Sequence, residues 1–301
     1  MFIVFTLFYL PLHKIIRRHM ISKNLTKFIR SLELKKNRQR EGLFLAEGPK
    51  VVADLMTAFH ARHIVATEQW LSQHQSDLDS FAGDARMEGT EVHIVNDEEL
   101  RRVSLLQHPQ QVLAVMEMPA TDDTPAIIAP TDTLFLALDG IQDPGNLGTI
   151  IRIADWFGIS TLICSQNTAD AYNPKVVQAT MGSLARVSIR YVDLPGYLSR
   201  LPEGTPVYGT FLDGNDIYGE RLTPSGIVVM GNEGNGISTE VAQWVNRRLL
   251  IPCFTPMDAP LAHNGRLQPS LTTRPDSLNV AVATAVTCSE FRRRTHAADK
   301  E

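Results

Sequence analysis

The sequence has little cysteine, and its N-terminal apolar run is short; each shortage excludes a class of protein. The three cysteines, Cys164, Cys253 and Cys288, lie far apart with no CxxC pair. This pattern argues against a disulfide framework or a zinc site and suits a reducing cytoplasm. The apolar run Phe2–Leu10 is too short to span a bilayer. We therefore expect a cytoplasmic protein with no metal and no membrane partner.

Residues 1–19 also lack the features of a secretory signal. Positive charge follows the apolar run instead of preceding it, and no small-residue cleavage site is evident. A cleaner amphipathic stretch opens at Met20. We interpret 1–19 as a non-essential extension, with a membrane anchor as the alternative.

Charge of one sign is not in excess over the whole chain. Lysine and arginine number 29 against 33 acidic residues, for a formal net charge of −4, so bulk electrostatics do not indicate a nucleic-acid binder. Between Met20 and Lys50, however, basic residues outnumber acidic ones by eight to three. This asymmetry is compatible with a polyanion-binding face, and a solvated helix surface is the alternative. The residues that we assign to such a face are Lys23, Lys27, Arg30, Lys35, Lys36, Arg38 and Arg40.

Helical and strand patterns alternate along the chain and predict two α/β domains. Residues 20–118 read as a small α/β domain, 119–132 as a linker with three prolines, and 133–301 as a second α/β domain. The hydrophobic content of 44% is enough for two modest cores. Apolar strands separated by helices favour a mainly parallel sheet in the second domain. Ligands of such sheets bind at the carboxyl ends of the strands, so the chemistry is expected in the loops there.

The first such loop is "DPGNLGTIIRIADWFG", which begins as a turn and becomes a helix. Asn146 is the predicted N-cap. Gly148, Arg152 and Asp155 share the face opposite the apolar stripe. A glycine inside a helix costs about 1 kcal/mol relative to alanine, so we expect Gly148 to open space for a ligand beside Arg152. The alternative is a surface pair of Arg152 and Asp155 with a tolerated glycine.

Two further loops carry polar residues next to a predicted strand end or helix start. "MGNEGNGIS", Met230–Ser238, has three glycines between a buried strand and a helix, which permits close approach of the backbone to a cofactor. Its glycine order is not that of a dinucleotide fold, and it has no P-loop Lys-Ser/Thr. The acid within it, Glu233, makes it unusual. In "RPDSLNVAVATAV", Ser277 is a candidate cap of the last helix and Asn279 lies in its first turn.

These three stretches together resemble a known family. "NLGTIIR", "MGNEGNGIS" followed by "LLIP", and "SLNVAVA" resemble the signature motifs of the SpoU/TrmH-type RNA 2′-O-ribose methyltransferases of the SPOUT class. The N-terminal domain resembles the small RNA-binding domain of many members. The resemblance implies a SPOUT-type parallel sheet with a C-terminal trefoil knot, S-adenosylmethionine bound in that knot, and a homodimer with its catalytic sites near the subunit interface.

The resemblance also implies roles for individual residues. The cofactor is expected against the backbone of Gly231, Ile251 and Leu278. The family's usual candidate for the general base corresponds to Arg152, which is cationic and has no acceptor lone pair. We prefer that Arg152 stabilises a developing alkoxide and grips the adjacent phosphate; a strongly depressed pKa is the alternative. Glu233 is expected to order its loop or a dimer contact. The polar signature positions are Asn146, Arg152, Glu233, Ser277 and Asn279.

The chain departs from the family between its second and third motifs. An insert at 253–276 replaces a short glycine turn, and its four prolines keep it from being helical. It is a solvated excursion, a lid or RNA contact through His263 and Arg266, or a cause of weakened cofactor binding. The predicted function is methylation of a ribose 2′-hydroxyl in structured RNA, ribosomal rather than transfer RNA by analogy. A non-catalytic RNA-binding or assembly protein and a tRNA methyltransferase remain as alternatives.

Overall fold

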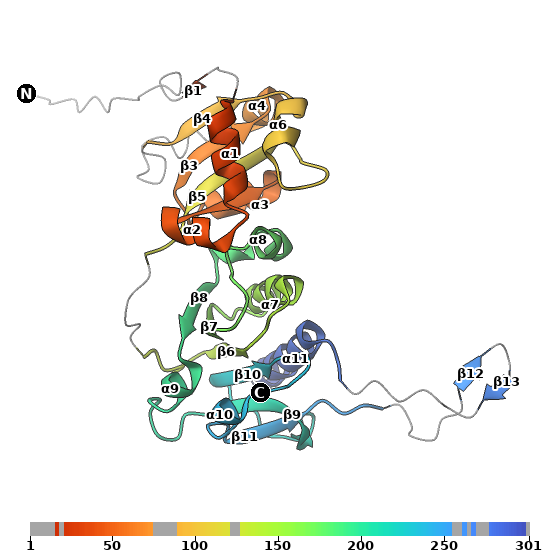
Figure 1. The fold of residues 1–301 in the computed structure, drawn as a ribbon. Helices are drawn as coiled ribbons and strands as arrows, with labels where there is room; N and C mark the ends of the chain where they lie inside the picture. The colour runs from red at the N-terminus through yellow and green to blue at the C-terminus, as the bar shows by residue number, and fades with distance from the viewer. Residues whose placement is uncertain are drawn as a thin grey trace, which may run out of the picture. The chain divides into compact units, whose positions relative to one another are not determined.

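The computed structural model describes residues 16–17, 21–74, 89–120, 127–254, 261–263, 266–268 and 277–298 (Figure 1). Most of the predicted extension 1–19, part of the linker 119–132 and most of the insert 253–276 lie outside these residues. None of the helices in the described ranges has the length and apolar character that a membrane span requires.

A five-stranded mixed sheet forms the N-terminal domain, in the order β1-β4-β3-β5-β2 (Figure 1). β3 pairs parallel with β4 and antiparallel with β5. The strands are β1 (Ile16–Arg17), β2 (Leu43–Glu47), β3 (Ala61–Ala66), β4 (Glu91–Ile94) and β5 (Val112–Glu117). The helices are α1 (Lys23–Ser31), α2 (Lys35–Glu41), α3 (Pro49–Met56), α4 (Glu68–Gln73) and α6 (Asp97–Val103). Because β1 pairs with β4, two residues of the predicted extension take part in this sheet.

The basic stretch that follows Met20 forms two helices rather than one continuous helix, because α1 stops at Ser31 before α2 begins. Carbonyl groups at the end of a helix need other donors, and α2 supplies them. Asn37 Nδ2 donates to the Ser31 carbonyl at 2.8 Å, and Arg38 Nη1 donates to the carbonyls of Leu32 and Glu33 at 2.8 and 2.6 Å. Two side chains of α2 therefore satisfy the free carbonyl groups at the C-terminal end of α1. Asn96 caps α6 and forms a capping box with Glu99.

A six-stranded sheet forms the C-terminal domain, in the order β11-β9-β10-β6-β7-β8 (Figure 1). The β6/β7, β6/β10, β9/β10 and β9/β11 pairs are all parallel, and β6 and β10 are buried along their whole length. This confirms the prediction of a mainly parallel sheet. The strands are β6 (Leu134–Asp139), β7 (Thr161–Ser165), β8 (Ser188–Val192), β9 (Val207–Asp216), β10 (Gly226–Gly231) and β11 (Arg247–Leu250).

Helices follow most strands of this sheet, as the sequence patterns predict. They are α7 (Pro144–Trp156), α8 (Pro174–Thr180), α9 (Leu194–Leu198), α10 (Thr239–Ala242) and α11 (Val280–Ala298), with a short 3₁₀ helix at Ser183–Ala185. Within the insert, β12 (Leu261–His263) and β13 (Arg266–Gln268) pair antiparallel. The prolines predict a non-helical insert, and these two short strands agree with that.

Two compact units divide the chain, and their boundary does not follow the sequence order. The first unit comprises residues 1–124 together with 147–152 and 169–188, and the second comprises the remainder. The first unit thus includes α8 and one stretch of α7 beside the N-terminal sheet. Segments on both sides of the predicted linker belong to it.

Gly148 is buried where α7 meets α8, and its lack of a side chain has a packing reason. A Cβ at Gly148 would lie 2.5 Å from the Ala179 Cβ and 2.9 Å from the Val176 carbonyl oxygen. The prediction that Gly148 opens room for a ligand is therefore wrong, because the two helices fill that room. Arg152 lies one turn further along α7 and is exposed.

A Gly148→Ala substitution is expected to lower the free energy of unfolding. The added methyl gains helix propensity but overlaps rigid atoms of α8, and overpacking costs about 1–3 kcal/mol. Urea titration followed by circular dichroism measures the loss. Adding Ala179→Gly to the same variant moves the gap to the facing helix and should recover part of it. No loss in the single variant would contradict the close approach.

Candidate functional site

Three polar side chains, one from each signature loop, join in a single line of hydrogen bonds. Asn146 Nδ2 donates to Glu233 Oε1 at 2.7 Å. Asn279 Nδ2 donates to Asn146 Oδ1 at 2.9 Å, across 133 positions of sequence. Asn146 lies in the first turn of α7, Glu233 in the loop after β10, and Asn279 directly before α11. We call these three residues the motif triad, and they tie the three loops to one another.

The residues that cap the N-termini of α7 and α11 are not the predicted ones. Asp143, not Asn146, caps α7, because Asp143 Oδ1 accepts a hydrogen bond from the Asn146 amide at 2.7 Å. The Asn146 side chain is thus available to bridge the loops. Asn279 and not Ser277 caps α11, since Asn279 Oδ1 accepts from two amides of the first turn at 3.0 and 3.3 Å. Ser277 is exposed.

The glycine-rich loop is held by Asn232, a residue that the sequence patterns did not single out. Asn232 Nδ2 donates to the Gly140 carbonyl at 2.7 Å, and its Oδ1 accepts from two loop amides at 2.9 and 3.1 Å. The loop folds back so closely that a Cβ at Gly231 would lie 2.3 Å from the Gly236 carbonyl carbon. The glycine-rich loop was expected to let the backbone approach a cofactor closely. In the structure, the close approach at Gly231 is to the backbone of Gly236 in the same loop. The available signal was an asparagine directly after the last glycine of a buried strand.

The ends of β6, β7 and β10 are hydrogen-bonded into one platform beneath these loops. Asp139, the last residue of β6, lies in register with Gly231 of β10. Its Oδ2 accepts from the Ser238 amide at 2.7 Å, and the next amide, that of Gly140, donates to Ser165 Oγ at 2.8 Å. The first two predicted loops are therefore neighbours at the carboxyl end of the sheet, as expected.

The predicted cofactor residues occupy different environments. Gly231 is buried at the end of β10, and Ile251 is half-buried directly after β11. Leu278, before α11, leaves 51% of its surface exposed. An exposed leucine beside polar loops is consistent with a ligand that would cover its side chain.

Arg152 is not part of the motif triad. It follows Asn146 by six residues on α7, which places it about 9 Å along the helix axis and roughly 120° around it. The structure therefore places Asn146, Glu233 and Asn279 together and leaves Arg152 on a separate, exposed surface of α7. Ser277 joins neither group in the hydrogen bonds of the described residues.

Six of the seven residues assigned to a polyanion-binding face are exposed. Arg30 also donates to the Ser104 carbonyl at 2.7 Å, and Arg40 pairs with Glu41 at 2.8 Å. The exposed set is Lys23, Lys27, Arg30, Lys35, Lys36 and Arg40. These six residues remain candidates for contacts to phosphates.

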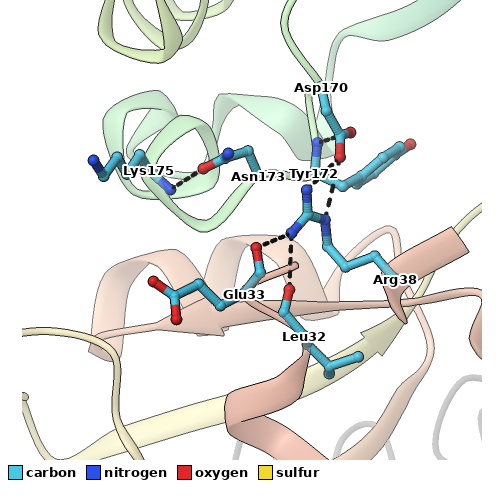
Figure 2. Close-up of polar contacts among 7 residues, drawn as sticks. All are labelled: Leu32, Glu33, Arg38, Asp170, Tyr172, Asn173 and Lys175. Carbon is cyan, nitrogen blue, oxygen red and sulfur yellow. Dashed lines mark hydrogen bonds and ion pairs between the residues drawn. The ribbon is translucent and has the colours of Figure 1, made fainter. Parts of the chain in front are cut away.

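Arg38, the seventh, is buried with 1% of its surface exposed, so its assignment to that face is wrong. Its Nη2 and Nε donate to Asp170 Oδ2 at 2.6 and 3.2 Å (Figure 2). Its Nη1 donates to the carbonyls at the end of α1. Asp170 Oδ1 accepts from the Tyr172 amide at 2.9 Å. With its guanidinium engaged on all sides, Arg38 is a structural residue of the first unit.

Comparison with known proteins identifies both domains. Residues 133–258 match the SpoU rRNA Methylase family, and residues 23–114 match the MRM3-like substrate binding domain. The chain is 29% identical to the 23S rRNA (guanosine(2553)-2′-O)-methyltransferase RlmP of Bacillus subtilis, over 87% of this chain and 94% of that protein.

Solved structures give the same relationship. A Porphyromonas gingivalis protein assigned to the TrmH family of RNA methyltransferases is 39% identical over 92% of this chain and 100% of its own, with a TM-score of 0.74. An rRNA methyltransferase from Sinorhizobium meliloti, solved with S-adenosylmethionine, is 29% identical over 93% and 98% of the two chains, again with a TM-score of 0.74.

Proposed function

Since the chain belongs to the SpoU/TrmH family of RNA methyltransferases, we propose that it methylates a ribose 2′-hydroxyl of ribosomal RNA with S-adenosylmethionine as donor. The observation that carries the proposal is the motif triad, because it holds all three signature loops at one end of the parallel sheet. Asn146 and Asn279 are half-buried and exposed respectively, so this end of the sheet is open to a substrate.

The residues present fit the cofactor. The main chain of the loop that packs against Gly231 and the exposed Leu278 side chain provide a main-chain cradle and an apolar surface, and with Ile251 they would hold the cofactor. S-adenosylmethionine, when bound, supplies an activated methyl group. The platform under the loops, from Asp139 to Ser238, keeps the cradle rigid.

The chain's own contribution to the reaction is positioning and the handling of one proton. A ribose hydroxyl is a weak nucleophile that gains from deprotonation as it attacks. The exposed guanidinium of Arg152 has several donors and no acceptor, so it stabilises the oxygen as negative charge develops and grips the adjacent phosphate. Glu233 accepts from Asn146, which supports a role as a positioning residue rather than a proton acceptor.

The RNA itself is held by the N-terminal domain. The exposed cations of α1 and α2 would supply contacts to phosphates that do not depend on sequence. The match of residues 23–114 to a substrate binding domain supports this division of labour. The 2′-hydroxyl distinguishes RNA from DNA at the reacting nucleotide.

Three finer properties belong to the same proposal. We propose a homodimer, supported by apolar side chains at the surface of the second unit, where Trp156 on α7 is 84% exposed and Val282 on α11 is half exposed. We propose a C-terminal trefoil knot, as the family resemblance implies. We propose the cytoplasm as the compartment, which suits free cysteines.

A binding and transfer experiment tests the function. The full-length protein is expected to bind labelled S-adenosylmethionine and to transfer label to ribosomal RNA, with the methylated ribose mapped by mass spectrometry. Gly231→Ala should weaken cofactor binding about 100-fold, or about 2.7 kcal/mol, because its Cβ has no space beside Gly236.

Gly234→Ala is the matched control in the same loop, because a Cβ there meets only Asn232 Oδ1 at 3.6 Å, and it should bind the cofactor normally. Uptake of no cofactor by the wild-type protein would instead identify a non-catalytic RNA-binding protein. Label in transfer RNA alone would overturn the ribosomal assignment.

A further inference from the structure

Three potential metal ligands meet on one face of the N-terminal sheet. His63 belongs to β3, and Glu91 and His93 belong to β4. β3 and β4 are parallel, with His63 in register with Glu91. Since side chains alternate along a strand, Glu91 and His93 share the face from which His63 also projects. Two paired strands, rather than a loop, thus position all three groups.

The distances among their ligand atoms equal those of a coordination shell. His63 Nδ1 is 3.4 Å from His93 Nε2 and 3.5 Å from Glu91 Oε2. His93 Nε2 is 3.6 Å from Glu91 Oε2. Donor atoms around a tetrahedral Zn²⁺, each about 2.0–2.2 Å from the ion, stand roughly 3.3–3.6 Å apart. An ion just outside the plane of the three atoms would reach them all without a change of backbone.

A hydrogen bond between the two imidazole rings is the competing explanation. At 3.4 Å, however, the ring nitrogens are further apart than the roughly 2.7–3.2 Å of an ordinary N–H hydrogen bond. Glu91 Oε2 is almost as far from both rings. Three ligand atoms at nearly equal spacing from one another suit a common central ion better than a proton shared by two of them.

The surroundings enclose the cluster on one side and leave it open on the other. His93 is buried and His63 half-buried, while Glu91 reaches the solvent. Phe28 of α1 packs edge-on against the His63 ring, with 6.3 Å between ring centroids. An ion would therefore enter from the side of Glu91.

We propose that His63, Glu91 and His93 bind one Zn²⁺ ion, with the fourth position left to water. Two imidazoles and one carboxylate suit Zn²⁺, whereas Ca²⁺ and Mg²⁺ prefer oxygen ligands throughout. The ion cross-links β3 and β4 beneath α1, the helix that carries Lys23 and Lys27. It would therefore stabilise the domain that we propose to hold the RNA. The expectation of no metal, based on unpaired cysteines, is thereby replaced.

Metal titration of the full-length protein, without an affinity tag and after chelator treatment, tests the site. Wild-type protein is expected to bind one Zn²⁺ per chain at this site and to show a higher melting temperature with Zn²⁺. Co²⁺ in its place should give the visible absorption of a four-coordinate ion. His93→Gln and Glu91→Gln should each weaken binding at least about 100-fold, the upper end of the loss from a disturbed outer shell.

Glu117→Gln is the matched control on the neighbouring strand. Glu117 Oε1 lies 3.2 Å from His60 Nδ1 and 3.5 Å from Arg62. This carboxylate therefore has one imidazole and one guanidinium beside it, whereas Glu91 has two imidazoles. This variant should keep the wild-type affinity and melting shift. Equal binding by wild-type and His93→Gln would overturn the proposal, and so would no binding by wild type. If the variants do not fold, X-ray absorption at zinc in wild type decides: two imidazole nitrogens support the site, and sulfur ligation refutes it.

Discussion

An Arg152→Lys variant is expected to lose roughly 10²–10³-fold in turnover, the usual cost of removing one donor from a developing oxyanion. Lysine keeps the positive charge but replaces the planar fork of donors with a single ammonium. It can attract a phosphate, but it cannot bind phosphate and the 2′-oxygen in the same geometry. The affinity for RNA should therefore fall by only a few-fold, so the loss appears in kcat. Single-turnover methylation with labelled donor measures it.

Arg200→Lys is the control for Arg152→Lys. Arg200 is also an exposed arginine of the C-terminal domain. It lies two residues after α9, and its Nε donates to the carbonyl of Gly196 in that helix. Its replacement should leave both turnover and RNA affinity unchanged. Near-normal turnover in Arg152→Lys would refute the need for a forked donor. A fall in the pH optimum of that variant would instead favour a proton-accepting role, because a lysine ammonium is a stronger acid than a guanidinium.

The second large effect is expected on stability, from Arg38→Ala. Removal of one partner of a buried ion pair costs about 3–5 kcal/mol, because the other charge is left without compensation. Asp170 keeps 13% of its side chain exposed, so the lower end of that range applies. The carbonyls of Leu32 and Glu33 also lose their donor. A urea titration of the full-length protein should show the first unit unfolding at much lower denaturant.

Arg40→Ala provides the comparison on the same helix. Its ion pair with Glu41 is exposed, and such pairs contribute about 0–1 kcal/mol. It should therefore leave stability almost unchanged and weaken RNA binding slightly at low salt. If Arg38→Ala were as stable as wild type but bound RNA less tightly, the phosphate-contacting role first assigned to Arg38 would stand.

Local features of this fold could be predicted from the sequence because their causes are local. The capping box at Asn96 needs only residues three apart. The buried strands β6 and β10 are apolar throughout, which predicts a parallel sheet with its ligand end after each strand. The polar signature residues Asn146, Glu233 and Asn279 were identified by motif, and the structure brings them into contact.

The predictions that failed depend on partners distant in sequence. Gly148 cannot reveal from its own neighbours that Ala179 lies against it. Arg38 reads as one more exposed cation until Asp170, 132 positions away, comes beside it. The approach of His63 to His93 follows from the register of β3 and β4, which a single sequence does not specify. In each case tertiary contact decides the role.

The hydrogen bonds of the motif triad run in one direction only. The Asn279 oxygen is taken by amides of α11, so only its nitrogen can face Asn146. Asn146 must then turn its own oxygen toward Asn279 and its nitrogen toward Glu233, a carboxylate that accepts and does not donate. An acid in place of Asn279 would set two acceptors against each other. The donors and acceptors at positions 146, 233 and 279 thus have one fixed order. A change at one of these positions limits which residues the other two can be.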